Sequence, residues 1–77
     1  MKELIEYIAR SLVTEPDAVV VTEEEWQGNR HRIHLEVADA DMGKVIGRGG
    51  RVAETMRALL KVAAAKQDAR AFLDIGD

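Results

Sequence analysis

Hydrophobic residues recur at a spacing of three to four positions in two segments of the chain. The first segment covers residues 2–13, and the second runs from Val52 to about Lys66. This spacing predicts two amphipathic helices, each with one apolar face directed toward a core. Pro16 is expected to end the first helix, because a proline keeps the preceding residue out of the helical region. The apolar positions are Leu4, Ile5, Ile8, Ala9, Leu12 and Val13 in the first helix and Val52, Met56, Leu59, Leu60 and Ala63 in the second.

Three shorter segments have the pattern of β-strands. Residues 18–22, "AVVVT", are rich in β-branched side chains, and residues 71–75, "AFLDI", are a short apolar run. Residues 32–37, "RIHLEV", alternate strictly between apolar and polar side chains, which is typical of a half-buried strand. The intervening "EEEWQGNR" breaks the strand pattern. Its Gly28-Asn29 pair favours a turn with positive φ, so we expect the first two strands to form a hairpin.

The order of these elements predicts the fold class. "DADM" (residues 39–42) offers Asp39 and Asp41 as candidate N-caps for a short helix that runs to about Ile46. The expected order is therefore helix, strand, strand, helix, helix, strand, without repeats or linkers. Helices that cover one face of a single sheet make a two-layer α+β design, and we expect one domain over residues 1–77.

Charge is distributed unevenly along the chain, whose net charge is −3. Residues 1–41 hold ten acidic and four basic side chains, whereas residues 42–70 hold seven basic and two acidic ones. This asymmetry indicates either an anionic partner for the basic segment or a solvated helix face.

Composition excludes several classes of protein. The 77 residues include no cysteine, which rules out disulfides and thiolate zinc sites. No window approaches the ~20 apolar residues of a membrane span, and no signal-peptide pattern is present, so we expect a soluble cytoplasmic protein. So short a chain buries only about 60% of its unfolded surface, which makes self-association, such as a homodimer, a reasonable expectation. Ser11 has no evident base, and no carboxylate pair lies near the glycines, so we expect neither an enzyme nor a cofactor.

The segment "GKVIGRGGRV" (residues 43–52) joins the last two predicted helices through Gly47-Arg48-Gly49-Gly50. Glycines let a phosphate backbone approach the main chain closely, and a helix that begins near Arg51 presents unpaired N–H groups. Arg48, Arg51 and Lys44 add positive charge. The alternative is a tight turn between helices that needs glycine only for its dihedral angles.

Spacing excludes two common nucleotide-binding loops. A Walker phosphate loop requires Ser or Thr after Gly43-Lys44, where Val45 stands, and a glycine at the position of Ala38. The dinucleotide fingerprint Gly-x-Gly-x-x-Gly cannot be built from Gly47, Gly49 and Gly50.

"VIGRGGR", placed between two helices and after a strand, resembles the Ile-Gly-x-x-Gly signature of KH domains. The element order is similar to that of the type II KH fold over the whole chain. "DMGKVIGRGGRVAETMRAL" most resembles the small stand-alone bacterial KH proteins of the KhpA family. The resemblance implies a mixed three-stranded sheet and single-stranded RNA held by the Gly-x-x-Gly loop, which clamps four nucleotides. It also implies an RNA chaperone that acts with a larger KH-containing partner, KhpB, and a link to cell-wall homeostasis and cell shape.

The family pattern implies which residues contact RNA. The clamp would be Gly47, Arg48, Gly49 and Gly50; the flanks of the groove would be Lys44, Val45, Ile46, Arg51, Val52 and Glu54, although Ile46 and Val52 are expected to serve the core more than the groove. One position departs from many KH domains, which have a large aliphatic residue where this chain has Ala53.

The remaining candidates favour structural interpretations. His31 and His34 point to opposite faces of a strand and cannot share a metal. The run Glu23-Glu24-Glu25 is more typical of a solvated hairpin than of a magnesium site, and Trp26 favours hairpin or partner contacts over base stacking. Arg57 and Lys61 either extend the basic surface or are simply solvated. The alternative to RNA binding is a protein–protein adaptor or dimerisation module with a KH fold and weak affinity for nucleic acid.

Overall fold

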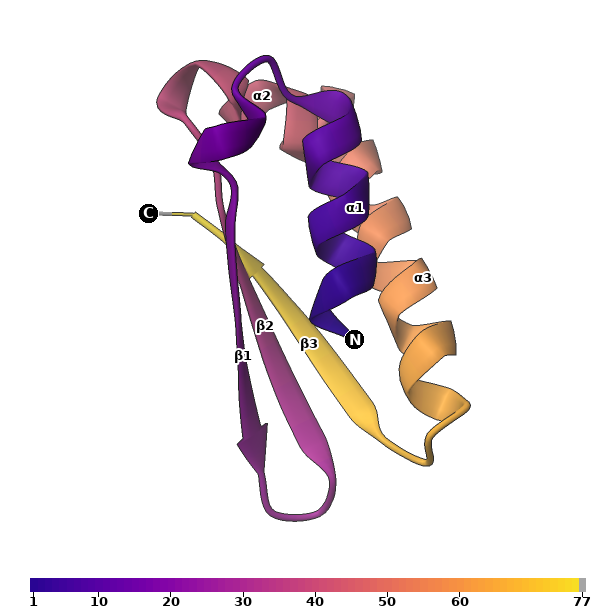
Figure 1. Cartoon of the computed structure of the whole chain (residues 1–77). Coiled ribbons are helices and arrows are strands. Elements are labelled where there is room, and N and C mark those ends of the chain that lie inside the picture. The colour runs from indigo at the N-terminus through magenta and orange to yellow at the C-terminus, as the bar shows by residue number, and fades with distance from the viewer. Residues whose placement is uncertain (77) are drawn as a thin grey trace.

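The computed structural model describes residues 1–76 of the chain (Figure 1). Its elements follow the order helix, strand, strand, helix, helix, strand, as the sequence predicts. The helices are α1 (Lys2–Leu12), α2 (Met42–Ile46) and α3 (Arg51–Ala65), and the strands are β1 (Val20–Trp26), β2 (Arg30–Glu36) and β3 (Arg70–Ile75). Single 3-10 turns occupy Pro16–Ala18, Asp39–Asp41 and Arg48–Gly50.

The three strands form one mixed sheet in the order β1-β2-β3. Strand β2 pairs antiparallel with β1 and parallel with β3. Figure 1 shows α1 and α3 along the same side of this sheet, with α2 at one end and the β1–β2 hairpin at the other. The predicted α+β class, with helices on one face of a mixed sheet, is confirmed. Within residues 1–76, no helix combines the length and the apolar character needed to cross a bilayer.

The core lies between the helices and the inner face of the sheet. Its largest fully buried side chains include Ile5 of α1, Ile33 and Leu35 of β2, and Met56 and Leu60 of α3. Alternation along β2 is as predicted, because its odd-numbered residues are buried while the even-numbered ones reach toward solvent.

The apolar stripe of α3 differs from the predicted one. Its buried residues are Ala53, Met56, Leu60 and Ala64, whereas Leu59, which was expected in the core, is 46% exposed. A helix of 3.6 residues per turn that centres Met56 and Leu60 on the sheet rotates Leu59 to the margin. Leu12 of α1 is likewise an expected core residue that the structure leaves exposed.

Strand β1 extends four residues further than predicted, because "EEEW" continues the ladder as far as Trp26. The charged side chains are tolerated there because β1 is an edge strand, and Glu24 stands opposite Arg32 of β2. The predicted turn is confirmed, with positive φ at Gly28 (77°) and Asn29 (57°).

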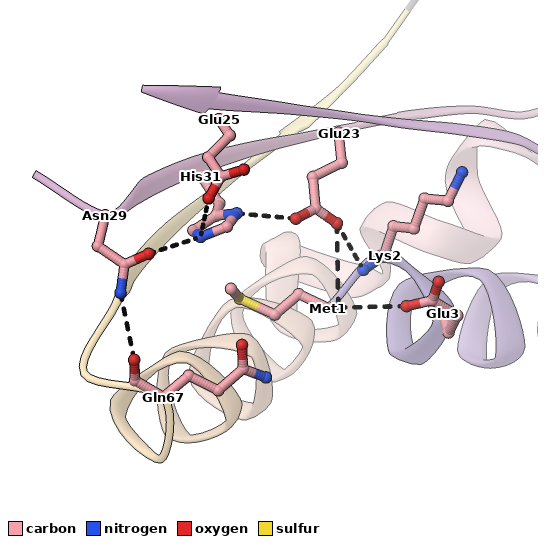
Figure 2. A network of polar contacts seen from close by, with 8 residues as sticks. All are labelled: Met1, Lys2, Glu3, Glu23, Glu25, Asn29, His31 and Gln67. Carbon is pink, nitrogen blue, oxygen red and sulfur yellow. Dashed lines mark hydrogen bonds and ion pairs between the residues drawn. The ribbon is translucent and has the colours of Figure 1, made fainter. Parts of the chain in front are cut away.

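A network of polar contacts ties the hairpin end of the sheet to both long helices (Figure 2). Glu23 Oε1 accepts a hydrogen bond from the Lys2 amide at 3.1 Å, and Glu23 Oε2 lies 2.8 Å from His31 Nδ1. The other nitrogen of the His31 ring lies 3.2 Å from Asn29 Oδ1. The Asn29 amide group in turn donates to the Gln67 carbonyl just beyond α3. Glu23 therefore has a structural partner, unlike the solvated acid that the sequence predicts.

The histidines behave as expected from their spacing. His31 is buried within the network, whereas His34 lies on the opposite face, 3.5 Å from Glu36 Oε1. Within residues 1–76, no group of three or more His, Cys, Asp or Glu side chains is arranged to hold a metal ion.

Asp41 has a different role from the predicted helix cap. Its carboxylate makes no capping bond to α2. Fully buried, it accepts hydrogen bonds from the Thr14 amide at 3.0 Å, the Thr14 hydroxyl at 2.8 Å and the Glu15 amide at 3.0 Å. The hydrogen bond from the Thr14 amide is the main reason why the pKa of Asp41 lies below its ordinary value. The side chain thus joins the segment after α1 to the start of α2.

We expect Asp41→Asn to melt at a clearly lower temperature than the wild type at pH 7, by about 5 °C or more, because it leaves a buried donor unsatisfied. A carboxyl group whose pKa is lowered by folding stabilises the protein above its ordinary pKa, and that contribution is lost as the pH falls through the folded-state pKa. The difference between the two melting curves should therefore shrink below about pH 4. Asp39→Asn, at an exposed site, is the control and should melt like the wild type. Equal melting temperatures at pH 7 for Asp41→Asn would contradict this role.

Candidate nucleic-acid interface

The glycine loop has a backbone that few other residues can adopt. Gly47 has φ 78° and ψ 170°, Gly49 has φ 64° and ψ 18°, and Gly50 has φ 80° and ψ 11°. The turn is closed by a hydrogen bond of 3.1 Å from the Gly50 amide to the Gly47 carbonyl. Three left-handed residues within four positions bring α3 directly after α2 and account for the run of glycines.

The glycines differ in what surrounds them. A β-carbon added to Gly47 would lie 2.4 Å from Val52 Cγ2 and 2.8 Å from the Val52 backbone nitrogen. The same atom added to Gly49 or Gly50 would meet nothing within 4 Å. Gly47 therefore lets the loop pack onto α3, whereas Gly49 and Gly50 leave the outer surface of the loop open to a ligand.

Positive charge gathers around this open surface. The side chains of Lys44, Arg48 and Arg51 are exposed, and none of them forms an ion pair within the part of the chain that the structure describes. The first turn of α3 also lacks a side-chain cap, because Gly50 is its N-cap residue. The amide groups of that turn and the three cations together form a surface suited to phosphate oxygens.

Val45 and Ile46, which the family pattern places beside the groove, differ in burial. Val45 is fully buried in the core, so its side chain cannot contact a ligand, which corrects the expectation for this residue. Ile46 is half-buried. Both belong to a helix of only five residues, and Val45 attaches that helix to the core.

Val52 and Ala53 account for the departure from the KH pattern. Ala53 is buried in α3, and the half-buried Val52 fills the space beside Gly47. With the small Ala53 buried in α3, the neighbouring Val52 packs against the loop at Gly47.

A groove of about 670 Å³ lies between α3 and β3. Its walls include Arg57 and Lys61 from α3 and Arg70, Phe72 and Leu73 from β3. The Arg57 Nε–H group donates a long hydrogen bond, 3.4 Å, to the Leu73 carbonyl. This carbonyl points away from β2, so the free edge of β3 offers main-chain groups to the groove.

The groove begins at Arg57, about two turns along α3 from the glycine loop. Glu54, Arg57 and Lys61 recur every three or four residues between the loop and the groove, and all three are exposed. Arg51 is also exposed, but it lines a separate hollow between α1 and α3. The sequence alone does not decide the roles of Arg57 and Lys61, and it does not point to Phe72, which is 50% exposed. The one signal for Phe72 was a strand with bulky apolar residues at successive positions, Phe72 and Leu73, which point to opposite faces.

A second surface lies on the helices, away from this groove. Tyr7, Leu59 and Val62 are 74%, 46% and 57% exposed. A shallow hollow of about 220 Å³ between α1 and α3 is lined mainly by apolar side chains, among them Ile8 and Leu59. We call Tyr7, Leu59 and Val62 the helix-face apolar strip.

Comparisons with known proteins all match the same family of KH-domain proteins. A family model described as "KhpA/KhpB, KH domain" matches residues 2–75. The chain is 48% identical over 77 residues to the RNA-binding protein KhpA of Halalkalibacterium halodurans, and the match covers 100% of both chains. It is 47% identical over 76 residues to the protein of that name from Caldanaerobacter subterraneus, covering 97% of this chain and 99% of the relative. The relative from Treponema pallidum is 45% identical over 76 residues, covering 99% and 94%.

Proposed function

Because the chain belongs to the KhpA/KhpB family of KH domains, we propose that it binds single-stranded RNA through the glycine loop and the groove between α3 and β3. The observation that carries the proposal is the open loop before α3, the helix that forms one wall of that groove, with an uncapped helix start and the exposed cations Lys44, Arg48 and Arg51. The relatives are named RNA-binding proteins, which supports the same function here.

Each part of the site has a distinct task in this proposal. The amides that begin α3 and the side chains of Arg48 and Arg51 hold the sugar–phosphate path against the loop. Bases that leave the stack enter the groove, where the edge of β3 offers hydrogen-bonding groups. A clamp of this kind does not sense the 2′-hydroxyl group, so single-stranded DNA of the same length should be compared with RNA.

The biological role that we propose is that of a cytoplasmic RNA chaperone or post-transcriptional regulator. The matching family model covers both KhpA and KhpB, which supports an assembly with a larger KH-containing partner of the KhpB kind. By its resemblance to the KhpA family, we propose a link to cell-wall homeostasis and cell shape. The protein is not an enzyme.

The second candidate function is a protein–protein adaptor or dimerisation module. The helix-face apolar strip favours it, because half-exposed Leu59 and Val62 on one helix form a surface that a partner could cover. This strip and the RNA groove lie on different faces of α3, so the two functions can coexist in one protein.

We expect weak RNA binding, around micromolar, with a moderate dependence on salt. With ~2–4 phosphates neutralised, a plot of log K against log[salt] should have a slope of roughly −1.5 to −3, because a single strand releases ~0.7 counterion per contact. Single-stranded RNA should also compete better than a duplex of the same composition, since stacked bases cannot enter the groove. Fluorescence anisotropy over a range of KCl concentrations measures both. A slope near zero, or equal competition by the duplex, would contradict the proposed site.

A further inference from the structure

The face of the sheet that no helix covers carries a cluster of arginine and aromatic side chains. Trp26, Arg30 and Arg70 occupy one row across β1, β2 and β3, and Arg32 and Phe72 occupy the next row. All five side chains are exposed, and their positions share the parity that points away from the helices. We call these five residues the open-face patch.

The patch is organised around the Trp26 ring. Arg30 Cζ lies 5.9 Å and Arg32 Cζ lies 6.0 Å from the centre of that ring, within the range of cation–π attraction. Trp26 is 42% exposed and Phe72 is 50% exposed, so both rings keep free surface. Exposed rings among guanidinium groups are the combination that holds single-stranded nucleic acid, because bases stack on the rings and phosphates pair with the cations.

The charge of the patch suits an anionic ligand. The patch holds three arginines, and two acidic side chains lie beside it. Both neighbour Arg32: Glu24 stands opposite it, and Asp74 forms an ion pair with it. The patch is therefore positive on a chain whose net charge is −3.

The open-face patch shares residues with the groove, which indicates the ligand of the patch. Arg70 and Phe72 belong to the open-face patch and also line the groove between α3 and β3. Strand β3 is the edge of the sheet, so a chain that leaves the groove over this edge meets Phe72 first and then Arg32 and Trp26. A folded acidic protein cannot pass from the groove over the edge of β3 in the way that a flexible single strand can.

We infer that the open-face patch is a second contact surface for the same single-stranded RNA, occupied by nucleotides that leave the groove and cross β3. The inference rests on the proposed function, and it lengthens the footprint beyond the four nucleotides that a KH loop clamps. Phe72 and Trp26 stack on bases in this arrangement, while Arg30 and Arg70 hold phosphates.

The test compares two lengths of RNA on the full chain. Mixed-sequence RNA pools of five and twelve nucleotides are titrated into the wild type and into Trp26→Thr/Arg30→Thr, whose two positions line the open face but not the groove. We expect the variant to lose at least about fivefold in affinity for the twelve-nucleotide pool, the low end for one stacked base, and to bind the five-nucleotide pool like the wild type. Tyr7→Thr/Arg10→Thr removes one exposed aromatic ring and one exposed arginine from α1, away from the open face, and should match the wild type with both pools.

A second measurement needs no variant, since Trp26 is the chain's single tryptophan. Its fluorescence should respond to the twelve-nucleotide pool and not to the five-nucleotide pool. An unchanged signal with both pools, together with equal affinities of wild type and variant, overturns the inference while leaving the groove intact. A signal that follows protein concentration instead of RNA assigns the patch to contacts between copies of the chain and also overturns it. Absence of binding to either pool removes the proposed function and the inference together.

Discussion

Replacing Arg48 and Gly49 together with aspartate is expected to abolish RNA binding while the protein stays folded. The double substitution removes one cation and adds two anions on the open surface of the loop. Loss of a charge-assisted contact with phosphate, together with repulsion by the new carboxylates, should weaken binding at least about 100-fold. The measurements are RNA affinity by anisotropy and thermal melting by circular dichroism.

The fold should survive this change for reasons visible in the loop. Arg48 is exposed, and a β-carbon at Gly49 would meet no atom within 4 Å. Gly49 has φ 64°, a left-handed conformation that aspartate tolerates better than most residues do. Gly47 and Gly50 keep the dihedral angles that the turn requires. The melting temperature should therefore change by no more than is usual for surface substitutions.

A control with the same change in charge separates local from general effects. Arg10→Asp/Ser11→Asp also removes one cation and adds two anions, on exposed positions of α1 that do not line the groove. It loses a surface ion pair between Arg10 and Glu6, 3.8 Å long, which contributes little to stability. It also loses an exposed hydrogen bond of 2.8 Å from the Ser11 hydroxyl to the Tyr7 carbonyl. RNA binding by this control should fall far less than binding by the loop variant. Unchanged RNA binding in a folded loop variant would refute the clamp and favour the adaptor function.

The second large effect is expected at Gly47, and it concerns stability. Gly47→Ala forces a β-carbon to within 2.4 Å of Val52 Cγ2 at a φ of 78° and ψ of 170°, a region almost confined to glycine. The clash and the dihedral strain should together cost roughly 3 kcal/mol. For a domain of this size, that lowers the melting temperature by more than about 10 °C.

Gly49→Ala is the matched control for this substitution. It introduces the same methyl group at a positive φ but into open space, so it should cost only about 1–2 kcal/mol. Adding Val52→Ala to Gly47→Ala should restore only part of the loss, because the Val52 backbone nitrogen still lies 2.8 Å from the added carbon. Equal melting temperatures for the two single alanine variants would show that the close packing of Gly47 on α3 contributes nothing to stability.

The elements that could be predicted are those in which one buried face leaves a regular hydrophobic pattern in the element's own sequence. Strand β2 alternates because one face packs on the helices, and that alternation is visible in the sequence. The sequence predicts too short a strand β1, because Glu23 to Glu25 carry no strand signal of their own. Their strand conformation comes from pairing with β2, and Glu23 also gains partners in Lys2 and His31. Local patterns do not contain such tertiary partners.

The candidate site also has a part that the sequence could predict and a part that depends on tertiary contacts. The glycine run and its cations could be found in the sequence because they are contiguous. Val45 could not be placed, since its burial depends on the direction in which α2 docks, and α2 is anchored from outside by the contacts of Asp41 with Thr14 and Glu15. The groove between α3 and β3 was missed because its walls come from segments that only the parallel pairing of β3 with β2 brings together.

The hydrogen bond from Arg57 to the Leu73 carbonyl also bears on solubility. A free sheet edge is a template on which a strand of another chain can add, and β3 is such an edge. The Arg57 guanidinium occupies a main-chain acceptor of that edge and places a charge beside it. β-Sheet extension between neighbouring molecules is thereby disfavoured, and the groove that we propose for RNA stays free of an added strand. Protection against aggregation and the shape of the groove thus depend on the same arginine.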